Sequence, residues 1–97
     1  MYKISKYSFE QAKKLGVTIK PSNVDGKKVD VFNKKGEKVA SIGALGMGDY
    51  PTYMRLEKEG KVEKGTANKR RKLYKQRHES DRHNKGTNGY YADKILW

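Results

Sequence analysis

Apolar and polar positions alternate in the middle of the chain, and this pattern predicts a β-hairpin over residues 28–43. Val29 and Val31 would lie on one face of a first strand, and residues 39–42 would return along a second strand. Residues 33–36, Asn-Lys-Lys-Gly, are typical of a hairpin turn. A lone two-stranded hairpin is marginally stable in water, so its apolar face needs a helix, a third strand or a partner.

The segment before the hairpin has the pattern of a short amphipathic helix. Ser8 with Gln11 three residues later forms a capping-box pattern, which predicts a helix over 8–15. Gly16 is a natural stop for this helix. Residues 17–19 then predict a short edge strand.

Three more helices follow from caps and spacing in the second half. An aspartate cap with a proline in the first turn, at 49–51, opens a helix that Gly60 would end. Thr66 would cap a third helix over 67–81, after a polar linker. Residues 87–97 are helical by pattern, with apolar side chains at four-residue spacing.

These elements predict an α+β fold: one small domain over 1–97, with an N-terminal helix, a β-hairpin and two or three C-terminal helices. Residues 1–48 would hold the helix and hairpin, and 49–97 the basic helical part. Only 17 of 97 residues are Leu, Ile, Val or Phe, so the core is thin. A thin core in a highly charged chain suggests that a partner helps to order it.

The net charge of +12 is the strongest compositional signal, and each half of the chain carries +6 of it. Such an excess attracts polyanions: nucleic acid, anionic lipid or acidic protein faces. The chain has no cysteine, which excludes disulfides and cysteine-based zinc sites. No window approaches the 18 apolar residues of a membrane span.

The stretch SIGALGMGDYPTYM, 41–54, places three glycines between a predicted strand and a predicted helix. A P-loop would require Gly-Lys-Ser/Thr at its end, whereas Gly48 is followed by Asp49. The glycine order GxxGxG also differs from the dinucleotide fingerprint GxGxxG. We therefore interpret the stretch as an interface loop, with a tightly packed turn as the alternative.

The segment NKRRKLYKQRHESDRHNK, 68–85, is the main candidate for binding a partner. Its first ten residues hold six cations and no acid, and Arg and Lys bind phosphate or carboxylate groups. The alternative is a solvated basic face, and no residue pattern indicates base-specific readout. The candidate residues for polyanion or partner binding are Lys69, Arg70, Arg71, Lys72, Lys75, Arg77 and Arg82.

His78 and His83 lie close to two acids, Glu79 and Asp81, but they do not form a metal motif. HExxH places its two histidines four residues apart on one helical face, and here the spacing is five. We expect the acids to pair with nearby arginines instead. No catalytic residues, metal ligands or cofactors are therefore predicted, and we expect no enzymatic activity.

Tyrosines and the apolar C-terminal end supply the candidate interface. Tyrosines are enriched at interfaces and can stack on bases, but packing in a core short of aliphatic residues is the alternative. The apolar end either closes the chain's own core or anchors in a neighbour. The candidate interface residues are Leu45, Met47, Tyr50, Tyr53, Tyr90, Tyr91, Ile95, Leu96 and Trp97.

Three segments, GALGMGDYPTYM, NKRRKLYKQRHE and KGTNGYYADKILW, resemble small basic proteins encoded by large double-stranded DNA viruses of algae and amoebae. The similarity covers about residues 41–97 and, loosely, the hairpin; RRKLYKQRH and YYADKILW are its specific parts. It implies a virus-encoded protein packaged in the particle, and it brings no catalytic residues.

The expected function is that of a minor capsid-associated protein that bridges neighbouring virion components through its basic helix and apolar C-terminus. The alternative is a nucleic-acid-binding, genome-condensing virion protein. The expected partners are capsid or other virion proteins, with DNA and an anionic inner membrane surface as further candidates and no small-molecule substrate. The expected location is the capsid interior, after synthesis in the host cytoplasm or nucleus.

Overall fold

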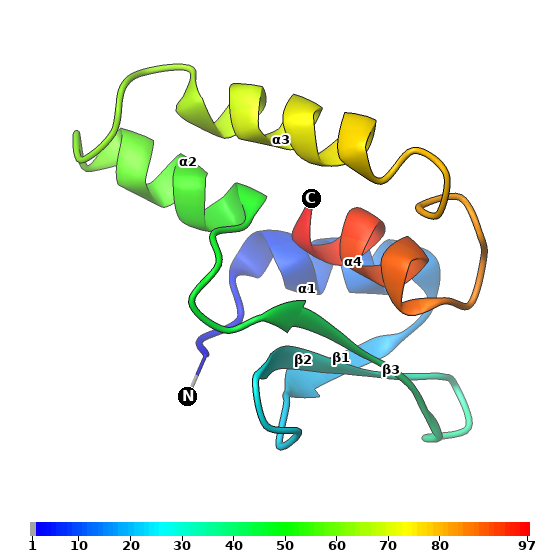
Figure 1. Ribbon diagram of the computed structural model, residues 1–97. Helices are drawn as coiled ribbons and strands as arrows, with labels where there is room; N and C mark the ends of the chain where they lie inside the picture. Colours follow the sequence, from blue (N-terminus) through cyan, green and yellow to red (C-terminus); the bar gives the residue numbers. More distant parts are fainter. Residues whose placement is uncertain (1) are drawn as a thin grey trace.

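The computed structural model describes residues 2–97 and has the predicted α+β fold, with four helices and one three-stranded antiparallel sheet. The sheet forms one layer, α1 and α4 lie across it, and α2 and α3 form a hairpin beyond them (Figure 1). The elements are α1 (Lys6–Leu15), β1 (Thr18–Pro21), β2 (Lys27–Phe32), β3 (Lys38–Ala44), α2 (Tyr50–Lys58), α3 (Thr66–Arg77) and α4 (Asn88–Leu96).

The sheet has the order β1-β2-β3, so β2 is central and the predicted hairpin and edge strand are both confirmed. Val29 lies opposite Ile42, and Val31 lies between Ile19 and Ala40. All five of these side chains are buried. The alternation noted in the sequence therefore marks the face of the sheet that the helices cover.

The first helix begins earlier than the sequence indicates. Ser5, not Ser8, is the N-cap, because its hydroxyl accepts a hydrogen bond from the backbone N–H of Ser8 at 3.1 Å. Ser8 lies inside the helix, fully buried, and its hydroxyl donates to the carbonyl of Ile95 at 2.9 Å. Gly16 ends the helix in the left-handed conformation, as predicted.

The C-terminal helix closes the core. Ile95 and Leu96 are 0% and 1% exposed and pack in one cluster with the buried residues of the sheet and α1. Of the two alternatives for the apolar end, the structure therefore has the first. These two side chains are not available to a neighbour, which corrects their place among the candidate interface residues.

The α2–α3 hairpin follows its predicted caps with two differences. Asp49 caps α2 by accepting from the N–H of Thr52 at 2.9 Å, as expected. Thr66 is the first residue of α3 rather than its cap; the N–H of Ala67 donates instead to Glu57 of α2, at 2.7 Å. The helix ends at Arg77 rather than at residue 81, because beyond it the N–H groups of Glu79 and Asp81 donate to carbonyls three residues back, on Gln76 and His78, as in tight turns.

Gly43, near the end of β3, is one of two tightly packed glycines in this stretch; the other is Gly48, where a Cβ would lie 2.5 Å from the ring of Tyr53. The φ of Gly43, +77°, is in the left-handed region. A Cβ at this position would lie 2.8 Å from Cδ1 of Leu96 and 2.9 Å from Cδ of Lys28. Close packing here, rather than binding of a nucleotide, accounts for this glycine.

Candidate functional site

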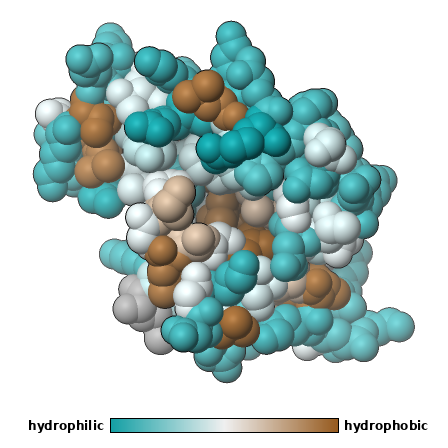
Figure 2. All heavy atoms as spheres, viewed as in Figure 1, coloured by the Kyte–Doolittle hydropathy of each residue, from teal (hydrophilic) through white to brown (hydrophobic). Residues whose placement is uncertain are grey.

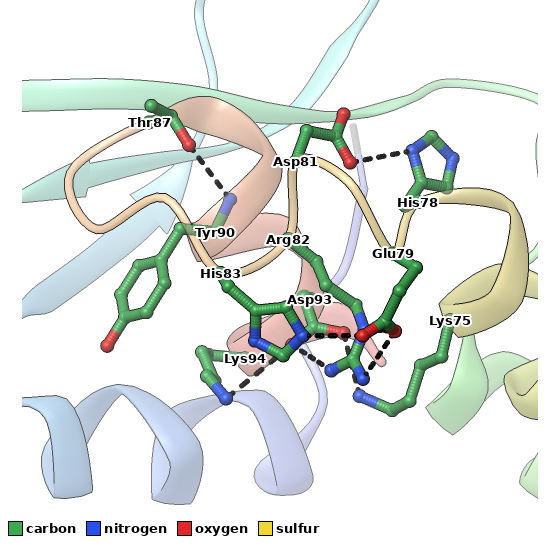
Figure 3. Close-up of polar contacts among 10 residues, drawn as sticks. All are labelled: Lys75, His78, Glu79, Asp81, Arg82, His83, Thr87, Tyr90, Asp93 and Lys94. Carbon is green, nitrogen blue, oxygen red and sulfur yellow. Dashed lines mark hydrogen bonds and ion pairs between the residues drawn. The ribbon is translucent and has the colours of Figure 1, made fainter.

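The candidate cations on and after α3 fall into two groups, because some of them are already neutralised inside the chain. Asp93 of α4 is fully buried at its side chain, and Lys75 donates to it at 2.7 Å. The guanidinium of Arg82 and the ammonium of Lys94 each lie 3.6 Å from its other oxygen (Figure 3). Lys75 and Arg82 therefore hold α4 and the preceding loop against α3, and they share the charge of Asp93 with Lys94, while Arg82 also pairs with Glu79.

Arg71 also has a structural position. Its guanidinium lies 4.7 Å from the ring centre of Tyr50, and its side chain is half-buried. The same ring packs edge-on against Tyr7 of α1 at 5.4 Å. Arg71 therefore packs between α2 and α3, and its guanidinium faces Tyr50 rather than a ligand at the outer surface.

The remaining candidates on α3 are open to a ligand, although the guanidinium of Arg70 also lies 5.5 Å from the ring centre of Tyr53. Each is exposed, and none forms an ion pair with any residue in the range 2–97. At 100° per residue, Arg70 and Arg77 lie on the same flank of the helix as Tyr74. Lys69 and Lys72 lie on the outer side. These exposed residues, Lys69, Arg70, Lys72 and Arg77, are called the free cations below.

A cleft of about 360 Å³ runs beside the flank of α3 that carries Arg70, Tyr74 and Arg77. It lies between α3, α4, the end of β3 and the loop over residues 45–49, which is called the glycine loop below. In Figure 2 the hollow between the α2–α3 hairpin and the sheet has apolar side chains at its base. Arg70 and Arg77 line it from α3 and Lys27 lines it from the sheet. The cleft therefore joins an apolar base to a cationic rim.

Aromatic rings form one wall of the cleft. The ring of Trp97 stacks on Tyr74 with 4.4 Å between centres and an interplanar angle of 7°. His78 packs on the same tyrosine at 4.3 Å, and Tyr53 lies 6.4 Å from Trp97. Burial raises the pKa of Tyr74 to about 12, with Asp93 and Asp81 adding to the effect. Tyr74 is therefore neutral at physiological pH, and its ring is held between those of Trp97 and His78.

Asp49 is a carboxylate in the lining of the cleft, and its charge is compensated. Lys28 lies 2.9 Å from it and Tyr2 donates to it at 2.7 Å. Burial would raise the pKa of Asp49, but hydrogen bonds from Thr52, Lys28 and Tyr2 outweigh burial and hold that pKa below its usual range. The wall therefore carries a paired charge that does not repel an anion.

Asp30, on the face of the sheet away from the helices, is a second buried carboxylate. Burial acts to raise its pKa, whereas the hydroxyls of Ser22 and Ser41, at 2.6 and 2.7 Å, and the charge of Lys38 lower it overall. Both aspartates are therefore ionised more strongly in the folded chain than in the unfolded chain.

We expect stability to fall in acid because of these two aspartates. With a folded pKa below the ordinary value of 3.8, each contributes stability that is complete above that value and is lost as the pH falls through the folded pKa. Urea unfolding at about pH 6 and about pH 3 should show this loss. Added salt at about 0.5 M should not remove it, since salt screens surface repulsion and not buried hydrogen bonds. Equal unfolding free energies at both pH values would contradict the expectation.

The histidines and neighbouring acids form two small surface pairs rather than one site. His78 lies 3.6 Å from Asp81, whereas Glu79 accepts from both His83 and Arg82 at 2.9 Å (Figure 3). These two contacts lower the pKa of Glu79. No group of three or more potential metal ligands occurs among the described residues.

The candidate interface residues are dispersed over the molecule. Leu45 and Met47 project from the glycine loop with 52% and 64% exposure. Tyr53 and Trp97 line the cleft, and Tyr50 packs against Tyr7 and Arg71. Tyr90 and Tyr91 pack edge-on against each other on α4, and Tyr91 also packs against the core. The structure does not bring these residues into one surface.

Sequence reasoning missed Lys27 and Lys28, the pairing of Lys28 with Asp49, and the stacking of His78. A lysine on a strand has the pattern of a solvent-facing residue, so nothing local marks Lys28 as buried. The cap position of Asp49 was a usable signal, because it fixed that carboxylate at the start of α2.

Comparisons of the chain with protein-family models, with curated proteins and with solved structures give no match. Within residues 2–97, no helix has the length and apolar character needed to cross a bilayer.

Proposed function

We propose that this protein is a non-enzymatic nucleic-acid-binding protein that contacts the phosphate backbone through α3. The proposal rests on one observation: the free cations share one helix, and no carboxylate of the described chain pairs with them. Phosphates attract such unpaired charges, and the released counterions make the binding sensitive to salt. From the resemblance expected on the sequence, we propose a packaged genome as the natural ligand.

The location of the charge can be tested with two variants of equal net charge. One replaces the free cations by Gln, and its control replaces Lys14, Lys34, Lys35 and Lys58, which are also exposed and lie on other elements. Each phosphate contact contributes about 0.9 to the slope of log affinity against log salt on duplex DNA and about 0.7 on single strands. We expect the α3 variant to lose most of the slope and the control to keep it.

Fluorescence anisotropy with labelled DNA between about 50 and 200 mM salt measures both slopes. Equal slopes in the two variants would show that total charge, and not α3, drives binding. Tighter binding to anionic vesicles than to DNA would point to a membrane surface and would overturn the proposal.

A second candidate is the bridging of virion components, and the glycine loop favours it. Leu45 and Met47 are exposed apolar residues that line a second hollow together with Lys3, Lys6 and Arg55, and Met47 also lines the aromatic cleft. Apolar side chains within a basic rim suit an acidic protein face. Loss of incorporation into particles in a Leu45→Ser, Met47→Ser variant that still binds DNA would support this role.

A further inference from the structure

We infer that the cleft beside α3 accepts a base of single-stranded nucleic acid while the cations on its rim contact the neighbouring phosphates. The inference rests on the proposed function and names the form of nucleic acid that the site takes. It depends on three features of the cleft: its aromatic wall, its charge and its place beside the free cations.

The aromatic wall offers stacking surface that the core does not use completely. Trp97, Tyr74 and Tyr53 all line the cleft and all are half-buried. Trp97 and His78 pack on Tyr74, and Arg70 lies over the ring of Tyr53, so we assign the stacking surface to Trp97, which Tyr74 supports from behind. The volume of about 360 Å³ is at the lower end of ligand pockets and suits one base with its sugar. Aromatic side chains bind unpaired bases of any sequence, because every base has a π-face.

The charge of the cleft matches a phosphate chain rather than a neutral ligand. Lys27, Arg70 and Arg77 line it and form no ion pair within residues 2–97. Asp49, the one side-chain carboxylate among the described lining residues, is paired with Lys28. A nucleotide presents an aromatic base and an anionic phosphate, which are the two chemistries that this cleft combines.

Entry of a base into the cleft favours a single strand over a duplex, and Leu73 marks the edge that the base must pass. This side chain is 48% exposed and lies between Arg70 and Arg77 at the edge of the cleft. Bases in a duplex are stacked and paired, so one of them could enter the cleft only after it had left the stack. An unpaired strand offers its bases without that cost.

Trp97 is the single tryptophan of the chain, so its fluorescence reports directly on the cleft. The intact protein is titrated with a thymidine strand of about 12 nucleotides, the same strand with abasic sites, a duplex of equal length and polyphosphate. We expect the thymidine strand to quench Trp97 and to bind about 5- to 150-fold more tightly than the abasic strand, the gain typical of one stacked base.

Two protein variants are titrated with the same set of ligands. Tyr74→Leu should remove most of the preference for bases, whereas the four-lysine control variant should keep it. The comparison between the thymidine and abasic strands uses the unaltered protein. It therefore tests the inference even if the Tyr74→Leu variant does not fold.

The outcomes separate this inference from the proposed function. Equal affinity for the thymidine strand, the abasic strand and the duplex, with unchanged Trp97 emission, would overturn the base site and leave phosphate binding by α3 intact. Failure to bind any nucleic acid at low salt would overturn both. Quenching by an acidic peptide but by no nucleic acid would assign the cleft to a protein partner and would also overturn the inference.

Discussion

Replacing Asp49 by Ala is expected to lower the free energy of unfolding by about 3–5 kcal/mol. The change leaves the Lys28 side chain, which is 5% exposed, without its carboxylate and with the carbonyl of Met47 as the remaining acceptor for its ammonium. It also removes the acceptor for Thr52 at the start of α2 and for the hydroxyl of Tyr2. For a domain of this size the melting temperature should fall by about 4–8 °C for each kcal/mol, which calorimetry or circular dichroism would measure.

Two controls separate the ion pair from the cap. Asp49→Asn keeps an acceptor for the N–H of Thr52 but removes the charge, so its loss should exceed the cost of a missing cap alone, about 1 kcal/mol. Adding Lys28→Met to Asp49→Asn removes the unpaired ammonium and should restore part of the stability. A loss below about 1 kcal/mol in Asp49→Ala would show that Lys28 reaches solvent once its partner is gone.

Gly43→Ala is expected to cost about 2–5 kcal/mol, from two causes that act together. A left-handed backbone costs an L-residue roughly 1–2 kcal/mol, and overpacking adds about 1–3 kcal/mol. The second cause applies because the new Cβ would lie within 3 Å of both Leu96 and Lys28. Urea unfolding measures the total.

Gly36→Ala is the matched control, since Gly36 has a φ of +83° and an added Cβ would meet nothing within 4 Å. It should show the backbone cost alone, about 1–2 kcal/mol. Equal losses in the two variants would mean that Leu96 and Lys28 move aside freely, and that the glycine is required for its backbone conformation only.

Most of the architecture could be predicted because its signals are local. The alternation around Val29 and Val31 predicted the hairpin, and the Asp49 cap and the left-handed Gly16 set helix ends correctly. The cap of α1 was misplaced because two serines, Ser5 and Ser8, lie in the same few residues. Only the burial of Ser8 against Ile95 distinguishes them, and that contact joins distant segments.

The candidate site was predicted only in part, because its local signals can be read from the sequence and its long-range contacts cannot. The sequence marks α3 as basic, but it does not tell which cations are already paired. Lys75 meets Asp93 across 18 residues, and Lys28 meets Asp49 across 21. The cleft is likewise formed by residues of several elements, so neither Trp97 nor Tyr74 alone indicated a stacking wall.

The contact between α1 and α4 also has a consequence for how the chain folds. The hydrogen bond from Ser8 to Ile95 joins residues 87 positions apart, whereas the β2–β3 and α2–α3 hairpins form between neighbours. The hairpins can form early, but they gain little stability until α4 covers the sheet, because the apolar core is completed only by Ile95 and Leu96. Bringing α4 back to α1 closes a loop of most of the chain, and the entropy cost of this closure precedes the burial of Ile95 and Leu96 that offsets it. The rate-limiting step is therefore expected to be the docking of α4, with the hairpins as transient, weakly populated precursors.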